Sequence, residues 1–413
     1  MGLFLDCFGE LPDPRRGNAR RHDLLELLTI ALSATLCGAA SCVDFELFAR
    51  SKEEFLREFL SLEGGVPSHD TFSRLFRLLD PAAFSTCLTR FAAGLSEASG
   101  DGPVALDGKG LRCALAKVRS TSPVALVNAF ASASGLALGL VGVPHGTGEI
   151  AALRVLLDLL DLRGRTVTAD AMHCQRETAQ AILDKGADYV LGLKANRFAM
   201  YDDAVLFLDD PAVQADTAAQ TLDADHGRIE TRCARVVADV AWLAERYSFP
   251  GLQALAEVTA SREDATGQIT TRRRLFVLSR PVTADALLAT VRSHWGIENQ
   301  LHWVMDVVFD EDRSRARTDN APLNLAVLRR IALNLAKANT SKGSVRGKIK
   351  RAGWDHAFLA ALILQMRQPW LQGSGKEAPA QLSTTNALAS KPRPVPQSRQ
   401  RPAAAALSIG RTP

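Results

Sequence analysis

Three acidic residues stand at places in the sequence where their side chains could meet. Asp107 lies in PVALDGKGL and Asp170 in TVTADAM, two short apolar runs, while Glu298 lies in the segment HWGIENQLHW. Carboxylates are hard oxygen ligands of the kind that Mg²⁺ and Mn²⁺ prefer. Two such ions roughly 4 Å apart can activate water or a 3′-hydroxyl and stabilise the leaving oxygen of a phosphodiester. The three acids therefore predict a site for two Mg²⁺ or Mn²⁺ ions that acts on phosphodiesters.

A second metal chemistry is open at the last of these acids. His294, Glu298 and His302 recur every four residues, so on a helix they could all contact one zinc ion. The segment lacks the adjacent His-Glu of the H-E-x-x-H motif, and a zinc hydrolase is therefore the less favoured interpretation. With about 100° per residue, His302 lies roughly 40° around the helix from Glu298 and Asp306 about 80°. Glu298 rather than Asp306 is then the expected metal ligand. The rotation of the helix is fixed by an apolar stripe, Ile297, Leu301, Val304 and Val308.

The elements that must position the acids follow from the hydrophobic pattern. PVALDGKGL and the two halves of ALVNAFASASGLALGLVGV read as strands, and EIAALRVLLDLLDL reads as a helix. The strand TVTADAM, the helix CQRETAQAILDKG and the strand ADYVLGLK come next. This β-β-β-α-β-α-β order predicts an α/β fold, a mixed sheet covered by helices as in a ribonuclease-H-like core. In that order the first and fourth strands are neighbours, so Asp107 and Asp170 should emerge side by side, with Glu298 packed across them.

Other regions flank this core. Residues 1–100 carry helical patterns and predict an all-α amino-terminal domain, followed by a catalytic domain at 101–370. Strand-like segments between about 196 and 281 predict an inserted, mostly β subdomain. The stretch 371–413 is rich in Pro, Ala, Ser, Gln and Arg and lacks a core pattern, which predicts a disordered basic tail.

One amino-terminal segment has the outline of a DNA-binding motif. In EGGVPSHDTFSRLFRLLD two glycines end one helix, and Ser68 can cap the next. Helix, glycine turn and helix suit a helix-turn-helix, in which Arg74 and Arg77 would meet phosphates. A plain helical hairpin fits the same pattern, and the sequence leaves both interpretations open.

Composition and charge indicate the partners and the compartment of the protein. The 413 residues carry a net charge of only +4, but two basic clusters stand out, Arg313 to Arg317 and Lys342 to Arg351. Each is either a solvated face or a nucleic-acid surface. Seven cysteines without a C-x-x-C pair predict free thiols in a reducing compartment. The apolar stretch from Leu24 contains Glu26 and favours a buried helix over a membrane span. We expect a cytoplasmic protein.

On its longer motifs the chain resembles the DDE transposases of bacterial insertion sequences, in the subgroup that includes the H-repeat-associated proteins. The motifs are GVPSHDTFSRLF, ALDGKGLR, VTADAMHCQRETAQAILDKGADYVLGLKANR, HGRIETR and RSHWGIENQLHWVMDVVFDEDRSR. The resemblance implies that Asp107, Asp170 and Glu298 form the catalytic triad and bind Mg²⁺ or Mn²⁺. It also implies strand cleavage and transfer at the element's terminal inverted repeats, with target DNA as a second partner and a homodimer in the synaptic complex. A relative that binds DNA without catalysis is the alternative.

The chain departs from the wider class around its glutamate. The class pattern Tyr-x2-Arg-x3-Glu-x6-Lys reads Val291, His294, Glu298 and Met305 here. Other side chains are therefore expected to contact DNA, namely Lys194, Arg292, His294, His302 and Arg313. The resemblance further implies an aromatic residue in the insertion that stacks on a flipped base, for which Trp242 is the candidate. The alternative is that Trp242 is a core residue. Relatives often carry Lys-Ser-Asn-Glu-Ile where this chain has GTGEI, which ends in Glu149 and Ile150.

Overall fold

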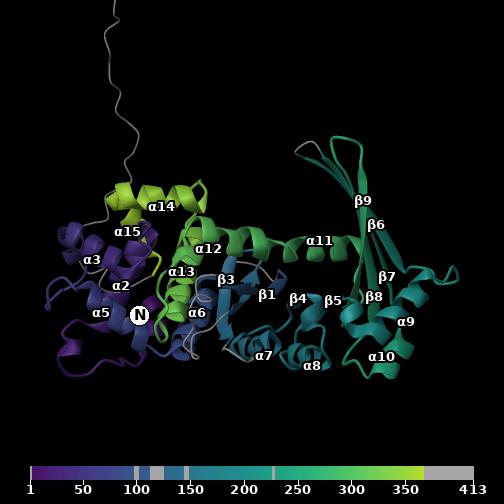
Figure 1. Ribbon diagram of the computed structural model, residues 1–413, viewed down its shortest axis with the longest axis horizontal. Coiled ribbons are helices and arrows are strands. Elements are labelled where there is room, and N and C mark those ends of the chain that lie inside the picture. The colour runs from purple at the N-terminus through teal and green to yellow at the C-terminus, as the bar shows by residue number, and fades with distance from the viewer. Residues whose placement is uncertain (1, 97–101, 112–124, 144–147, 226–227, 367–413) are drawn as a thin grey trace, which may run out of the picture. The chain divides into compact units, whose positions relative to one another are not determined.

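The sheet of this protein continues well beyond the five strands expected of its core. The computed structural model describes residues 2–96, 102–111, 125–143, 148–225 and 228–366 (Figure 1), so the expected tail at 371–413 lies outside the described residues. In these residues nine strands form one sheet in the order β3-β2-β1-β4-β5-β9-β8-β7-β6. The strands are β1 (Val104–Gly110), β2 (Ala125–Ala131), β3 (Leu136–Val143), β4 (Thr166–Ala169), β5 (Asp188–Leu193), β6 (Thr217–Asp225), β7 (Arg228–Val237), β8 (Ala254–Glu263) and β9 (Ile269–Leu278).

The first five strands have the expected connectivity. β1, β2 and β3 pair antiparallel, and β1 pairs with β4 and β4 with β5 in parallel. The first and fourth strands are therefore neighbours, as the pattern predicts. The mixed α/β architecture is confirmed.

The strands after β5 extend this sheet rather than forming a second one. β9 pairs antiparallel with β5, with Val190 opposite Leu278, and β8, β7 and β6 follow outward. The segment also contains two helices, α9 (Phe198–Asp209) and α10 (Ala241–Tyr247). The expected β insertion is thus joined edge to edge with the core sheet (Figure 1).

Helices cover both faces of the first part of the sheet. The remaining helices are α1 (Leu3–Phe8), α2 (Leu24–Leu36), α3 (Cys42–Ser51), α4 (Glu53–Arg57), α5 (His69–Leu78), α6 (Pro81–Ser96), α7 (Glu149–Leu159), α8 (Arg176–Asp184), α11 (Ala284–His294), α12 (Trp303–Val307), α13 (Ala321–Ala338), α14 (Val345–Trp354) and α15 (His356–Leu364). Along β1, Val104 and Leu106 belong to the core with α7 and α8, and Ala105 belongs to the core with α13. Because side chains alternate along a strand, Asp107 lies on the α13 face and Gly108 on the α7 face.

The amino-terminal helices share one hydrophobic core with the helices that follow the Glu298 segment. Phe4, Leu32, Phe72 and Phe91 belong to the same buried cluster as the apolar residues of α13 and α15, for example Leu328. A separate all-α domain at residues 1–100 is therefore not confirmed, although every regular element described there is helical.

Helix α2 is the apolar segment that the sequence raised as a membrane candidate. Its N-cap residue Asp23 accepts a hydrogen bond from the backbone N–H of Glu26, and nearly all of its residues are buried among other helices. Among the described helices, none combines the length and the apolar character needed to cross a bilayer.

Candidate active site

Asp107 and Asp170 lie at the same level of two neighbouring parallel strands, β1 and β4. Asp107 lies within β1, opposite Asn128 of β2. The parallel register sets Leu106 opposite Ala169, so Asp107 and Asp170 are the next residues along the two chains. The Asp107 side chain is mostly buried, and that of Asp170 is exposed.

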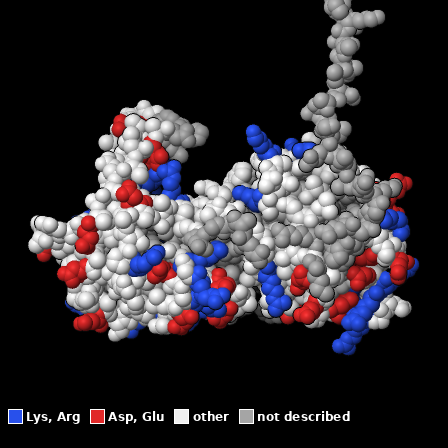
Figure 2. Space-filling model, turned by 180° about the vertical axis from the view of Figure 1, so that it is seen from behind, with Lys and Arg blue, Asp and Glu red and all other residues white. Residues whose placement is uncertain are grey.

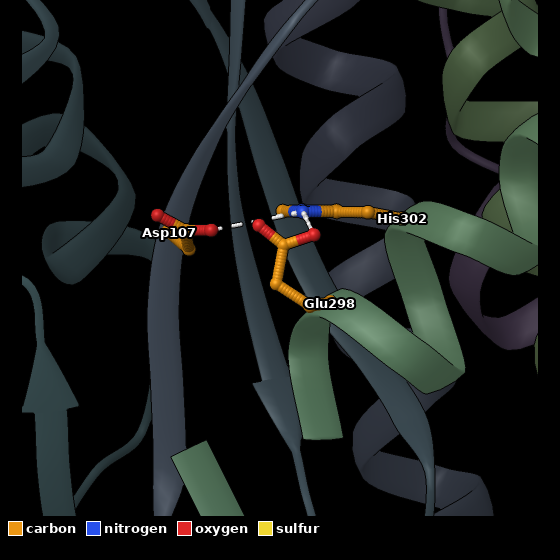
Figure 3. Close-up of side chains that lie close together, drawn as sticks. All are labelled: Asp107, Glu298 and His302. Carbon is orange, nitrogen blue, oxygen red and sulfur yellow. Dashed lines mark ion pairs between the residues drawn. The ribbon is translucent and has the colours of Figure 1, made fainter. Parts of the chain in front are cut away.

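Glu298 reaches this edge from a helix that crosses it. After α11 the helix widens into a π-helical turn at Glu298–His302 and continues as α12. Figure 3 shows Glu298 and His302 pointing toward Asp107. His302 Nδ1 lies 3.5 Å from Glu298 Oε2 and 3.6 Å from Asp107 Oδ2. The regular 100° spacing assumed from the sequence does not hold here, because a π-turn closes i→i+5 bonds and advances by a smaller angle per residue.

The acids crowd one another. Burial, followed by the negative charges of Asp170 and Glu298, raises the pKa of Asp107 to about 7. A divalent cation would relieve this repulsion and hold all three groups ionised. Among the described residues, ligand atoms of Asp107, Glu298 and His302 all lie within 4.8 Å of one another. The donor set therefore fits a divalent ion bound mainly by oxygen, with one imidazole nitrogen beside it.

The two histidines around Glu298 are neutral groups and not cations. Burial, with Arg330 and Lys109 adding positive charge, lowers the pKa of His302 to about 3. Burial also lowers the pKa of His294, whose Nδ1 lies 2.9 Å from Thr168 Oγ1. Neither imidazole carries the charge that a phosphate contact was expected to use.

The zinc arrangement considered from the sequence is not what the helix forms. His302 faces Asp107, whereas His294 faces Thr168 and lies 3.9 Å from Asp170. His294 is outside the ligand group formed by Asp107, Glu298 and His302.

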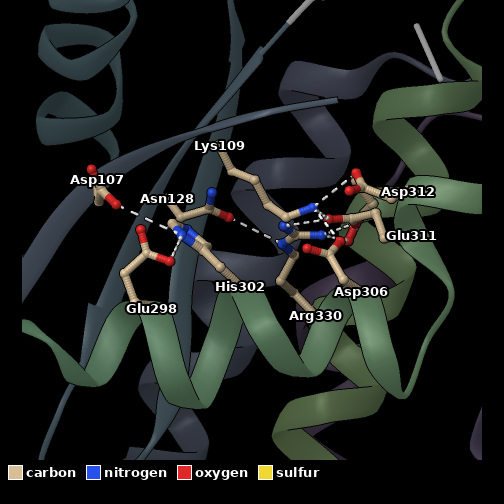
Figure 4. A network of polar contacts seen from close by, with 10 residues as sticks. Asp107, Lys109, Asn128, Glu298, His302, Asp306, Glu311, Asp312 and Arg330 are labelled. Carbon is tan, nitrogen blue, oxygen red and sulfur yellow. Dashed lines mark hydrogen bonds and ion pairs between the residues drawn. The ribbon is translucent and has the colours of Figure 1, made fainter. Parts of the chain in front are cut away.

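A buried network of charged side chains lies beside the site (Figure 4). Arg330 of α13 donates to Asn128 Oδ1 at 3.1 Å and pairs through both terminal nitrogens with Glu311. Burial alone would raise the pKa of Glu311, but the Arg330 guanidinium overcomes it and lowers the pKa to about 2. Asn128 is the partner of Asp107 across the β1–β2 ladder, so the network reaches the strand that carries Asp107.

Lys109 adds a second cation to that network. Its ammonium lies 2.6 Å from Asp306 and 3.3 Å from Glu311. Asp306, which the sequence offered beside Glu298 as a possible metal ligand, therefore forms an ion pair with Lys109. The network was not predicted from the sequence; a signal was present in Arg329 and Arg330, two adjacent arginines in the middle of a largely apolar helix.

Glu149 is a fourth acid close to Asp107. A Cβ at Gly108 would lie 2.0 Å from Glu149 Oε1, so the carboxylate packs directly on the backbone beside Asp107. His173 Nε2 lies 3.2 Å from the same oxygen, and His173 is fully buried. Glu149 thus connects β1 with the short helix that follows Asp170.

The amino-terminal candidates are only partly arranged as expected. Ser68 is the N-cap residue of α5, but its side chain makes no capping hydrogen bond and its Oγ lies 3.2 Å from Thr71 Oγ1. Arg77 is paired with Asp319 at 2.8 Å and is not free for phosphates. Arg74 is exposed and lines a polar hollow with Arg15, Arg21 and His22.

The other predicted DNA contacts differ in availability. Arg292 pairs with Asp223, and Arg313, although largely exposed, lies 3.7 Å from Asp310. Lys194 is exposed and lines a cavity of about 610 Å³ beside Asp170.

Trp295 borders this cavity, and Trp242 lies elsewhere. The Trp295 ring is 46% exposed and lies under the guanidinium of Arg274, 5.0 Å from ring centre to carbon. Trp242 lies in α10, half-buried, with its ring centre 5.2 Å from that of Phe207. Trp242 therefore packs against the hydrophobic core from a half-buried position and does not line the cavity beside Asp170.

Comparison with protein families identifies the family of this chain. Residues 99–335 match the model described as Transposase DDE domain, and residues 5–92 match the model described as DDE_Tnp_1-associated. The chain belongs to the DDE transposase family. The match to the Transposase DDE domain includes all three acids, and helices α14 and α15 lie beyond it.

Known relatives place this transposase in the H-repeat subgroup. It is 29% identical over 362 residues to the H repeat-associated protein YhhI of Escherichia coli (strain K12), covering 86% of this chain and 95% of the relative. It is 39% identical over 282 residues to a protein encoded in the dhlA 3′ region of Xanthobacter autotrophicus, covering 67% and 94%. A piggyBac transposase synaptic complex with hairpin DNA matches at 11% identity with a TM-score of 0.40, over 92% of this chain and 78% of that one.

Proposed function

We propose that this transposase cleaves and joins DNA strands at the ends of its insertion sequence, with Asp107, Asp170 and Glu298 as its catalytic acids. The observation that carries the proposal is the crowding of these acids, in which burial and then the charges of Asp170 and Glu298 raise the pKa of Asp107 to about 7. Crowded and partly buried carboxylates are costly unless a cation balances them. Two Mg²⁺ or Mn²⁺ ions fit this need and, when bound, supply activation of the attacking oxygen and stabilisation of the leaving oxygen.

Each side chain of the site has a role that follows from the element that carries it. Asp107 and Asp170 project from the sheet edge of a core that we infer to be ribonuclease-H-like, and Glu298 closes the site from the crossing helix. His302 is neutral near pH 7, so its Nδ1 can hold Glu298 and Asp107 in place without competing with a cation for their charge.

The bound partner in this proposal is the double-stranded end of the element. Lys194 and Arg274 flank the cavity beside Asp170 and suit phosphates there, and Arg74 suits phosphates at the amino-terminal hollow. Trp295, rather than Trp242, offers the aromatic face for a base that leaves the stack, because it borders the cavity at Asp170. Two copies of the chain would hold two ends in one synaptic complex.

The decisive test is Glu298→Gln, which keeps the shape of the side chain and removes its charge. We expect the variant to lose metal-dependent cleavage of the element's ends by a factor of about 10³ or more, while its affinity for those ends stays unchanged. Asp306→Asn is the comparison on the same helix and should cost less, because Asp306 pairs with Lys109.

Metal replacement completes this test. Mg²⁺ or Mn²⁺ should restore cleavage to the metal-stripped protein, and zinc should not. Full cleavage by Glu298→Gln, or cleavage with zinc alone, would sink the assignment. DNA binding without any metal-dependent nicking by the unaltered protein would instead identify it as a DNA-binding relative.

A further inference from the structure

The second basic cluster of the sequence forms one exposed face of helix α14. Arg346, Lys350 and Trp354 follow at intervals of four residues, so they line one side of the helix, and all three are exposed. We call these three residues the α14 stripe. Trp354 is 80% exposed, more than any other large apolar side chain in the described part of the chain.

The opposite side of α14 is occupied by the protein itself. Ile349 and Ala352 are buried in the helical core, and Ser344 caps the helix by accepting from the Gly347 N–H at 3.1 Å. The helix is therefore held in a fixed orientation. Because its apolar side already faces the core, the outward side is available to a polar partner.

The charge of this surface is not balanced locally. No acid occurs between Asn339 and Trp354 in the sequence. Within the described residues, Arg346 and Lys350 have no carboxylate partner, in contrast to Arg351, which pairs with Asp355. Figure 2 shows Lys and Arg side chains along the upper edge, where α14 lies. An exposed, uncompensated basic face with an aromatic end is typical of a nucleic-acid contact.

Contacts connect α14 to the catalytic turn. Lys337, at the end of α13, donates to Gln300 Oε1 at 3.4 Å, and Gln300 belongs to the π-turn that carries Glu298. Lys348 of α14 donates to the carbonyl of Ala336 in α13 at 3.0 Å. Hydrogen bonds of lysine side chains thus link the turn that bears Glu298 to α14 through the end of α13.

We propose that the α14 stripe binds the backbone of duplex DNA beside the cleaved phosphodiester. The inference rests on the proposed function and adds a contact surface to it. Arg346 and Lys350 stand about 6 Å apart along the helix and can each meet a phosphate. Trp354 packs against a sugar or a base at the end of this track. A lipid surface fits less well, since a membrane-bound helix needs its apolar face outward.

The test measures how the affinity of the full-length protein for a random-sequence duplex depends on salt. The double variant Arg346→Gln/Lys350→Gln should bind more weakly and lower the slope of log K against log salt by about 2, because each phosphate that a cation no longer neutralises removes about 1 from the slope. Trp354→Ala should weaken binding severalfold and leave the slope unchanged, because it removes no charge.

A charge-matched control separates a local contact from net charge. Arg154→Gln/Arg176→Gln removes the same charge from exposed positions of α7 and α8, and its slope should remain that of the unaltered protein. Equal slopes for the two double variants would overturn the inference. So would unchanged DNA binding by the α14 double variant together with weaker binding to phosphatidylserine-containing vesicles, which would mark a membrane surface instead.

The outcomes also distinguish this inference from the proposed function. If the unaltered protein cleaves DNA but the α14 double variant keeps its full slope, the inference fails and the proposed function stands. If the slope falls as expected but no metal-dependent cleavage occurs with the unaltered protein, the α14 contact stands and the catalytic assignment fails.

Discussion

At the residue scale, the absence of a side chain at Gly108 leaves room for the Glu149 carboxylate beside Asp107. A methyl group at Gly108 would meet Glu149 Oε1 at 2.0 Å, so Gly108→Ala must displace Glu149 from His173. A buried His173 nitrogen left without its partner costs about 1–3 kcal/mol. We expect that decrease in the free energy of unfolding, measured by chemical denaturation.

The same strand provides a matched control for this prediction. A Cβ at Gly110 meets nothing within 4 Å, so Gly110→Ala should be nearly neutral by comparison. The double variant Gly108→Ala/Glu149→Ala should cost less than the sum of its single changes, since the clash is gone. Strict additivity would show that Glu149 does not lie over Gly108 in solution.

The sequence identifies the acids better than it identifies their support. Asp107 and Asp170 could be predicted because residue type and strand alternation are local properties. The pairing of Arg330 with Glu311, and of Lys109 with Asp306, joins elements far apart in the chain, and no local pattern specifies it. The neutral state of His302 likewise follows from burial and neighbouring charges, which only the packed structure defines.

At the element scale, Glu46 of α3 ties down the start of helix α5. Its carboxylate accepts from the backbone N–H of His69 at 2.7 Å and lies 2.8 Å from His69 Nδ1. The His69 backbone N–H, followed by the side chains of Arg50 and His69, lowers the pKa of Glu46 from 4.5 to about 2. A pKa lowered by folding means that the ionised carboxylate stabilises the native state.

The sign of the pH dependence follows. The contribution of Glu46 is fully present above about pH 4.5 and disappears as the pH falls toward 2. Thermal melts of Glu46→Gln should therefore show a smaller decrease of melting temperature across that window than the unaltered protein. Glu58→Gln, at an exposed position beside α4, should keep the original decrease. An identical acid profile for Glu46→Gln would rule out the tie between α3 and α5.

Element order was predictable where the chain pairs with itself locally. Short apolar runs locate β1 to β5, and turn residues separate several of them. The pairing of β5 with β9 is different, because Val190 and Leu278 are distant in sequence and the same strands could have formed a sheet of their own. The π-turn at Glu298 also has no sequence signature in this chain, yet it sets the direction of His302.

At the scale of the whole molecule, the amino-terminal helices depend on the carboxy-terminal ones. The Asn324 side-chain amide of α13 donates to the carbonyls of Phe76 and Leu79 at 2.8 and 2.9 Å. The Phe4 N–H donates to the carbonyl of Met366 at 2.9 Å. A DNA-binding module cut out near residue 100 would thus expose one side of its core and leave these carbonyls without partners.

We therefore predict that residues 1–96 alone do not unfold cooperatively, because apolar burial against α13 and α15 is missing. Joining residues 1–96 through a flexible linker to 321–366 should restore a single cooperative melt, followed by circular dichroism. The same fragment joined to 149–193, which carries α7, α8 and the strands β4 and β5 in place of α13 and α15, is the control and should stay without one. A cooperative transition in residues 1–96 alone would show that the amino-terminal helices form an independent domain, and would make that fragment the simplest probe of recognition of the element's ends.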